Sequence, residues 1–80
     1  MEIHWTESAG ATRYELWLNL VNPVTGRQTA VVRTSQIFEP RLTLSGLSAG
    51  TYRGWIRGIR DEAGAAYESE WSLGFNVLVN

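Results

Sequence analysis

Apolar residues occupy every second position in several short stretches of this chain, which is the pattern of a strand with one buried face. The clearest stretch covers residues 11–20, where a tyrosine and three leucines alternate with other residues. The same period of two marks residues 3–5, 41–44, 51–60 and 75–79, and residues 28–34 are rich in β-branched residues. No useful window shows the period of a helix. The pattern predicts an all-β chain with about six to seven strands.

Residues that favour turns separate these stretches about every eight to twelve residues, a spacing typical of an antiparallel β-sandwich. Residues 22–26, with Asn-Pro at their start and Gly at their end, predict a hairpin turn between the strands at 11–20 and 28–34. Residues 61–65 predict a loop tip. Eighty residues allow one modest core, so we expect residues 1–80 to form a single domain, a module of a longer chain.

The stretch 47–57 combines a turn glycine, Gly50, with a strand that opens at Tyr52. In β-sandwiches a tyrosine at such a place often forms a tyrosine corner, in which the ring enters the core and the hydroxyl bonds backbone a few residues upstream. The alternation that follows puts Ile56 on the inner face of the strand. With the inward residues of the other strands, and with Leu47 closing the bottom of the sandwich, the predicted core comprises Trp5, Tyr14, Leu16, Leu18, Leu47, Tyr52 and Ile56.

Composition and charge narrow the classes of function. The net charge is −1 and the seven basic residues, all Arg, are scattered, so we expect no nucleic-acid partner. The chain has no Cys and only one His, His4, which leaves no credible transition-metal site, and we expect no cofactor. No apolar run is long enough for membrane insertion, and because the strand pattern begins directly after Met1 we expect no signal peptide in these residues.

Catalytic residue types are present singly but not in a working combination. An exposed His4 near the N-terminus and carboxylates in the loop around residue 61 supply no nucleophile beside a base. The acidic residues between 61 and 70 lack the spacing of a calcium loop. We therefore expect a protein that is not an enzyme and that holds no metal.

A set of spaced residues extends over nearly the whole chain: Ile3-x-Trp5, Ala11-Thr12-x-Tyr14-Glu15-Leu16-Trp17, Leu47-x-x-Gly50-x-Tyr52, Arg53-x-Trp55-Ile56-Arg57, Ser69-x-Trp71-Ser72 and Phe75-x-Val77. This set resembles a fibronectin type III domain of the kind found in bacterial multidomain proteins. The resemblance implies an immunoglobulin-like antiparallel β-sandwich, with sheets ABE and CC′FG packed face to face.

The sequence departs from that family pattern in three ways. Strand B starts at about Ile3, which leaves no residues for strand A, so strand B is expected as an exposed edge that pairs with a second copy or a neighbouring domain. Gly54 and Gly58 stand where the family has larger inward residues. Either the core is thin there or a bulky ring fills the space, with Trp5 as the candidate. The loop after residue 60 has no Arg-Gly-Asp, so an integrin-type function has no support.

Trp17 and Trp55 share the outward parity of neighbouring strands, so their indoles should lie close together on one sheet face. An exposed aromatic face suits a sugar or a partner protein. The alternative is that Arg13, Arg53 and Arg57 stack on the rings as a structural ladder. The segment Ser69-Glu70-Trp71-Ser72 resembles half of the Trp-Ser-x-Trp-Ser box of cytokine-receptor type III domains, where Trp and Arg interleave, and this favours the ladder.

The resemblance implies a non-catalytic spacer or adhesion module of a larger secreted or surface protein, located outside the cell or on its surface. Its partners would be neighbouring domains of the parent chain, and a homodimer through the exposed strand edge is a further expectation. The alternative function is recognition of a carbohydrate or a protein. The residues predicted to form that binding face are Trp17, Trp55, Trp71, Arg53 and Arg57.

Overall fold

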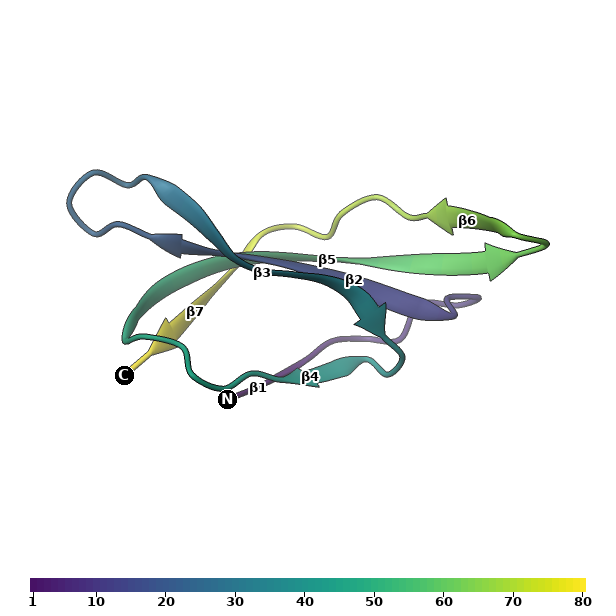
Figure 1. Ribbon diagram of the computed structural model, residues 1–80, viewed down its shortest axis with the longest axis horizontal. Coiled ribbons are helices and arrows are strands. Elements are labelled where there is room, and N and C mark those ends of the chain that lie inside the picture. The colour runs from purple at the N-terminus through teal and green to yellow at the C-terminus, as the bar shows by residue number, and fades with distance from the viewer.

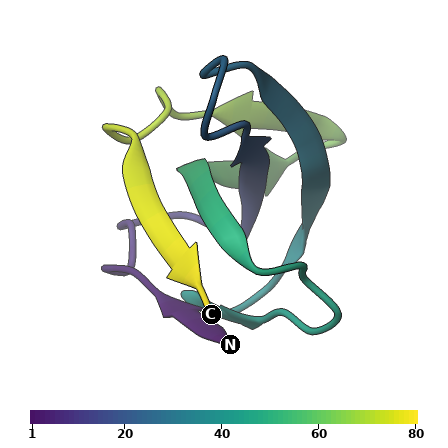
Figure 2. The same cartoon turned by 90° about the vertical axis from the view of Figure 1, so that its left-hand side faces the viewer.

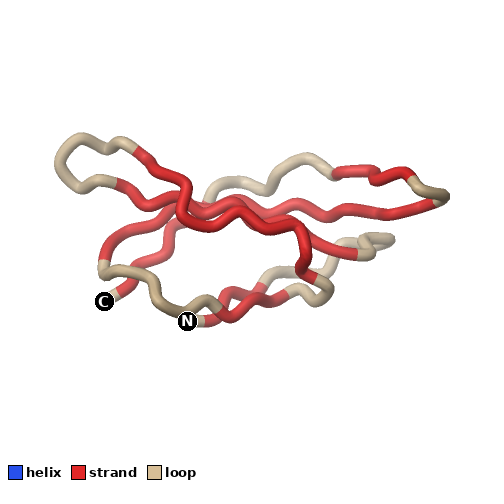
Figure 3. The backbone as a smooth tube through the Cα atoms, viewed as in Figure 1, coloured by secondary structure: helices blue, strands red, loops and turns tan.

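The computed structural model describes all of residues 1–80 and consists of antiparallel strands and loops without a helix (Figure 3). The strands are β1 (Glu2–His4), β2 (Arg13–Val21), β3 (Gln28–Ile37), β4 (Arg41–Thr43), β5 (Gly50–Glu62), β6 (Ala65–Glu68) and β7 (Phe75–Val79). The predicted all-β class is confirmed. Since there is no helix, none is available to span a membrane.

The strands form two sheets of unequal size. The larger sheet has the order β3-β2-β5-β6, and β7 also pairs with β5. The strand β6 pairs with residues 59–62 of β5, and β7 pairs with residues 50–54. The two short strands therefore lie along opposite ends of β5. The smaller sheet contains only β1 and β4, and it lies across from the larger one (Figure 1). The arrangement is consistent with a β-sandwich.

Local turn chemistry fixes both hairpins of the larger sheet. In the predicted turn between β2 and β3, the N–H groups of Val24 and Thr25 donate to the side-chain oxygen of Asn22, an Asx turn. The loop expected at residues 61–65 is shorter than predicted, because β5 continues through Glu62. Only Ala63 and Gly64 form the turn, both with positive φ, which is the two-residue hairpin geometry that matches strand twist.

The predicted tyrosine corner is present at the start of β5. The Tyr52 hydroxyl donates to the Ser48 carbonyl at 2.6 Å, and the ring is almost fully buried. Along β5 the inward and outward residues alternate as the sequence pattern predicted, with Tyr52 and Ile56 buried and Trp55 half-buried on the other face. The corner therefore anchors the loop after β4 to the longest strand of the fold.

Side chains between the two sheets form the core. Of the predicted core residues, Tyr14, Leu16, Leu18, Tyr52 and Ile56 are buried, and Ile37 joins them. Ile59 is also buried, but by the alternation along β5 it lies on the opposite face, that of Trp55 and Arg57. Trp5 and Leu47 are only partly buried, which corrects the prediction for these two. The small sheet has three-residue strands, so it cannot cover side chains that lie beyond its ends. Trp5 packs edge-on against Tyr14 with ring centroids 5.5 Å apart.

Two inward glycines of β5 make room for side chains from other elements. A Cβ on Gly54 would lie 2.7 Å from the ring of Phe75, so the phenylalanine of β7 fills this space. A Cβ on Gly58 would lie 3.2 Å from the Cβ of Ala11. The sequence-based candidate for the filling ring, Trp5, is therefore wrong at both positions, because Trp5 packs over Tyr14 instead.

Candidate functional site

The outward face of the larger sheet gathers the aromatic and charged residues predicted as a binding face. In the β2–β5 register Trp17 lies opposite Trp55, and Glu15 lies opposite Arg57. On the other side of β2, Trp17 lies opposite Arg33 of β3. The structure brings together all five predicted binding residues with two more, and we call this set the tryptophan–arginine face: Trp17, Trp55, Trp71, Arg53, Arg57, Arg33 and Glu15.

The three indoles of this face touch without forming a flat platform. The ring centroids of Trp17 and Trp55 are 5.6 Å apart and the ring planes are tilted by 49°. Trp71 meets Trp17 edge-on, with a centroid distance of 6.1 Å and an angle of 61°. All three side chains are half-buried, between the fully covered and the open arrangements that the sequence left as alternatives. Their tilt presents edges as well as faces to the solvent.

Guanidinium groups cover the indole rings. The Arg57 guanidinium lies 4.2 Å from the Trp71 ring centroid, and that of Arg33 lies 4.5 Å from the Trp17 centroid. The Arg33 group also approaches Trp71 at 5.8 Å, so the order Trp17, Arg33, Trp71, Arg57 forms a ladder. These distances are within the range of favourable cation–π contact, worth about 0.5–2 kcal/mol each.

The predicted arginines behave differently from one another. Arg53 lies 5.7 Å from the Trp55 ring, and Arg57 stacks closely on Trp71. Arg13 is not part of the ladder, which corrects the expectation for that residue, because its guanidinium is held by Asp61 and by the Ser35 carbonyl. Arg33 was missed. The register of the β2–β3 hairpin carries the signal for it, since it sets Arg33 directly beside Trp17.

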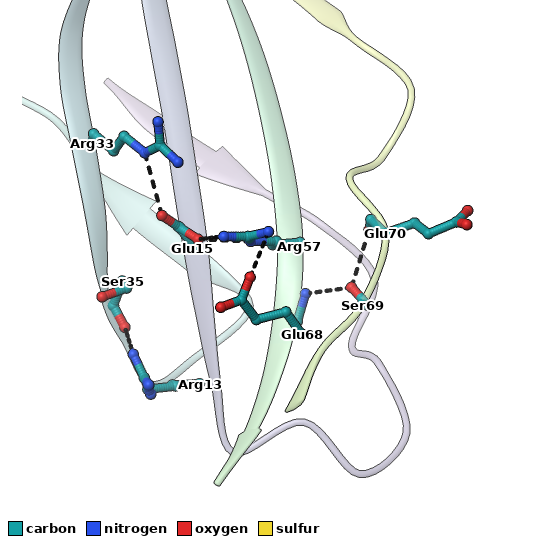
Figure 4. Close-up of polar contacts among 9 residues, drawn as sticks. Arg13, Glu15, Arg33, Ser35, Arg57, Glu68, Ser69 and Glu70 are labelled. Atoms are coloured by element: carbon teal, nitrogen blue, oxygen red, sulfur yellow. Dashed lines mark hydrogen bonds and ion pairs between the residues drawn. The ribbon is translucent and has the colours of Figure 1, made fainter. Parts of the chain in front are cut away.

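Glu15 holds two of the stacking arginines in place and was also missed by sequence reasoning. The residue is only 8 % exposed, and its Oε1 atom accepts from Arg57 Nε at 2.7 Å. Its Oε2 atom lies 3.4 Å from Arg33 Nε. Arg57 continues the network through Nη1 to Glu68 Oε2 at 2.6 Å (Figure 4). A buried carboxylate needs such partners, so the ion pairs and the stacking support each other.

Two serines fix the segment that carries Trp71 between β6 and β7. The Ser69 hydroxyl accepts from the Gly58 N–H at 2.9 Å, and the Ser72 hydroxyl accepts from the Ile56 N–H at 3.0 Å. In return, the Ser69 and Ser72 backbone N–H groups donate to the carbonyls of Gly58 and Ile56. The two serine hydroxyls thus take the place of backbone carbonyls as acceptors for N–H groups of β5. Both serines, three residues apart, act in the same way, although only half of the tryptophan–serine box is present in the sequence.

A separate ion pair lies where β5 enters its hairpin with β6. Arg13 Nε donates to Asp61 Oδ2 at 2.8 Å, and Arg13 Nη2 reaches Asp61 Oδ1 at 3.1 Å. The Thr12 hydroxyl donates to the same carboxylate at 2.9 Å. These hydrogen bonds lower the pKa of Asp61 below its usual value and raise that of Arg13. The pair fastens β2 to the far end of β5.

The residues first considered for catalysis or metal binding lie apart from one another. His4 is exposed and forms a 2.7 Å contact with Glu2, away from the tryptophan–arginine face. No three His, Asp or Glu side chains converge as a metal site would require. The cations of the tryptophan–arginine face contact acceptors or rings of the same chain. What this face offers is aromatic edges and hydrogen-bonding groups on a rigid sheet, which suits packing or recognition.

No family model, no curated protein and no solved structure matches this chain. The fold alone defines the class of this chain: an all-β protein with two antiparallel sheets and one core between them.

Proposed function

We propose that this chain is a fibronectin type III-like module that serves as a non-catalytic spacer or adhesion unit of a larger secreted or cell-surface protein. In that immunoglobulin-like fold β1 and β4 correspond to strands B and E, and β3, β2 and β5 correspond to strands C′, C and F. The interrupted pair β6 and β7 corresponds to strand G. The strand order and the tyrosine corner at Tyr52 support this assignment.

One observation carries the spacer function. The residues best suited to bind a ligand are already engaged with each other: Arg33 and Arg57 cover Trp17 and Trp71, and the Glu15 carboxylate pairs with both guanidiniums. A ligand would have to displace these contacts before it could stack on the rings. Stacking and ion pairs across three strands stiffen the sheet, and a stiff sheet holds neighbouring domains at a fixed distance.

The alternative function is recognition of a carbohydrate or a protein through the same face. Its supporting observation is that Trp17, Trp55 and Trp71 are each half-buried, with the Trp17 ring centroid 5.6 Å from that of Trp55 and 6.1 Å from that of Trp71. Aromatic edges at a sheet surface are a common part of binding sites.

Titration of the 80-residue chain with a panel of soluble oligosaccharides distinguishes the two functions. Tryptophan fluorescence reports on the face directly, because three of the four indoles belong to it. The spacer function predicts no saturable change with any sugar. A saturable change that disappears in Trp17→Phe, but persists in the core-packing variant Trp5→Phe, would establish recognition instead.

A further inference from the structure

The outer edge of β1 is open. In the small sheet Met1 exchanges hydrogen bonds with Leu44, and the Trp5 N–H donates to the Pro40 carbonyl at 3.0 Å. Along an antiparallel strand, every second residue directs its backbone N–H and C=O groups to a given neighbour. In β1 and the residues beside it, the backbone groups of Met1, Ile3 and Trp5 point to β4. The backbone N–H and C=O groups of the two residues in between, Glu2 and His4, therefore point away from the sheet. Figure 2 shows β1 (purple) with no further strand outside it.

An apolar groove lies beside this edge. It has a volume of about 280 Å³ and is lined mainly by Ile3, Trp5, Ile56, Leu73 and Phe75. Leu73 is 94 % exposed, although it stands next to core side chains. An open strand edge together with an apolar groove is the combination that accepts an additional strand, because backbone groups and side chains are satisfied at the same time.

We propose that the occupant is β1 of a second copy of this chain, paired antiparallel about a two-fold axis at Ile3. In this register Glu2 of each copy lies opposite His4 of the other. The N–H and C=O groups that point outward on Glu2 and His4 then bond to one another across the axis, and none is left over. The two small sheets merge into one four-stranded sheet, β4-β1-β1-β4.

The side chains of the edge are self-complementary in the same register. Glu2 and His4 point to the outer side of the sheet, and within one chain Glu2 Oε1 lies 2.7 Å from His4 Nε2. Across the two-fold axis the acid of one copy faces the imidazole of the other, twice. On the inner side Ile3 meets Ile3 of the second copy. A strand from an unrelated partner would need to match this short acid–apolar–imidazole order by chance.

Another edge of the fold fits this role less well. The pairing of β3 with β2 shifts register twice, and β3 carries Arg33, both of which discourage regular addition of a strand. The inference is independent of whether the tryptophan–arginine face binds a ligand, since that face lies on the other sheet.

Sedimentation velocity of the 80-residue chain over a wide range of concentration tests the proposal. We expect a reversible monomer–dimer equilibrium. His4→Pro should weaken the dimer by about tenfold or more, because proline removes an outward N–H while all bonds between β1 and β4 remain. The matched control is Leu78→Ser on β7, which removes a 68 % exposed leucine from a different edge and should leave the dimer unchanged.

A charge exchange separates edge pairing from loss of folding. Glu2→Arg should weaken the dimer, because a cation then faces His4 of the second copy. The double variant Glu2→His with His4→Glu exchanges the two residues, so an acid still faces an imidazole across the axis. It should dimerise as the parent chain does. A chain that stays monomeric at all concentrations would overturn the proposal, and so would a dimer that responds to Leu78→Ser but not to His4→Pro.

Discussion

At the scale of single residues, Glu15 has the largest influence on the tryptophan–arginine face. Its buried carboxylate, on β2, contacts the two arginines that cover Trp17 and Trp71. Without Glu15, Arg57 would keep only Glu68 as a partner, and the half-exposed Arg33 would lose its carboxylate partner. The face is therefore more sensitive to this acid than to any exposed charge.

Replacement of Glu15 by glutamine should lower the free energy of unfolding by about 2 kcal/mol, because two ion pairs in a partly buried site become weaker contacts between a charge and an amide dipole. Urea unfolding followed by circular dichroism measures the change. The control is Glu39→Gln, whose carboxylate lies 2.9 Å from Arg41 in a pair that is exposed to solvent. An exposed pair is worth about 1 kcal/mol or less. Equal losses for the two variants would contradict the account.

Gly54 gives a second test at this scale. A methyl group there would meet the Phe75 ring at 2.7 Å and a Leu18 methyl group at 3.0 Å. Gly54→Ala should therefore cost about 1–3 kcal/mol by overpacking. Combined with Phe75→Leu, which removes the nearest ring atoms, the alanine should cost clearly less. Strict additivity in a double-mutant cycle would show that the ring does not fill this space.

At the scale of elements, side-chain hydrogen bonds join strands at places where the regular ladder ends. The two serines before β7 continue the edge of β5, and the Arg13–Asp61 pair fastens β2 to the same strand near its hairpin. The strand β5 thus receives partners along its whole length, which accounts for its thirteen residues.

The Arg13–Asp61 pair makes a contribution to stability that depends on pH. Because the folded state lowers the pKa of Asp61, its contribution is present above the usual aspartate value of 3.8 and is lost as the pH falls through the lowered value. Asp61→Asn should therefore be less stable than the parent at neutral pH, and the difference should shrink in acid. Thermal unfolding across this range measures it. A difference that does not vary with pH would contradict the assignment.

The positions of the strands, and the side of each strand that is buried, could be predicted from the sequence, because apolar and polar residues alternate along a strand with one buried face. The buried positions Leu16, Leu18 and Tyr52 follow directly from this pattern. Partners across strands depend on register, which alternation alone leaves open. For this reason Arg33 and Glu15 were missed at the tryptophan–arginine face. The Phe75 ring fills the space beside Gly54 because β7 begins at Phe75 and pairs there with β5. No local sequence signal fixes where β7 begins after the irregular segment before it.

At the scale of the whole molecule, the two sheets have different tasks. The five-stranded sheet carries an outer face of stacked indoles and guanidiniums and most of the buried side chains, whereas the two-stranded sheet leaves a strand edge and an apolar groove open. A module with one closed face and one open edge is suited to a structural position within a larger assembly. This is the basis on which we favour a spacer or adhesion unit over a recognition domain.

The most direct test of this account is a double-mutant cycle between Arg33 and Trp17, with Arg33→Met and Trp17→Leu. Arg33 suits the cycle because its own contact to Glu15 is long, at 3.4 Å, while its guanidinium lies 4.5 Å from the indole centroid. If the face is a structural ladder, unfolding free energies should show a favourable coupling of about 0.5–2 kcal/mol. Additive effects, with Trp17→Leu leaving stability unchanged, would mean that the indole does not support the fold and is available for a ligand.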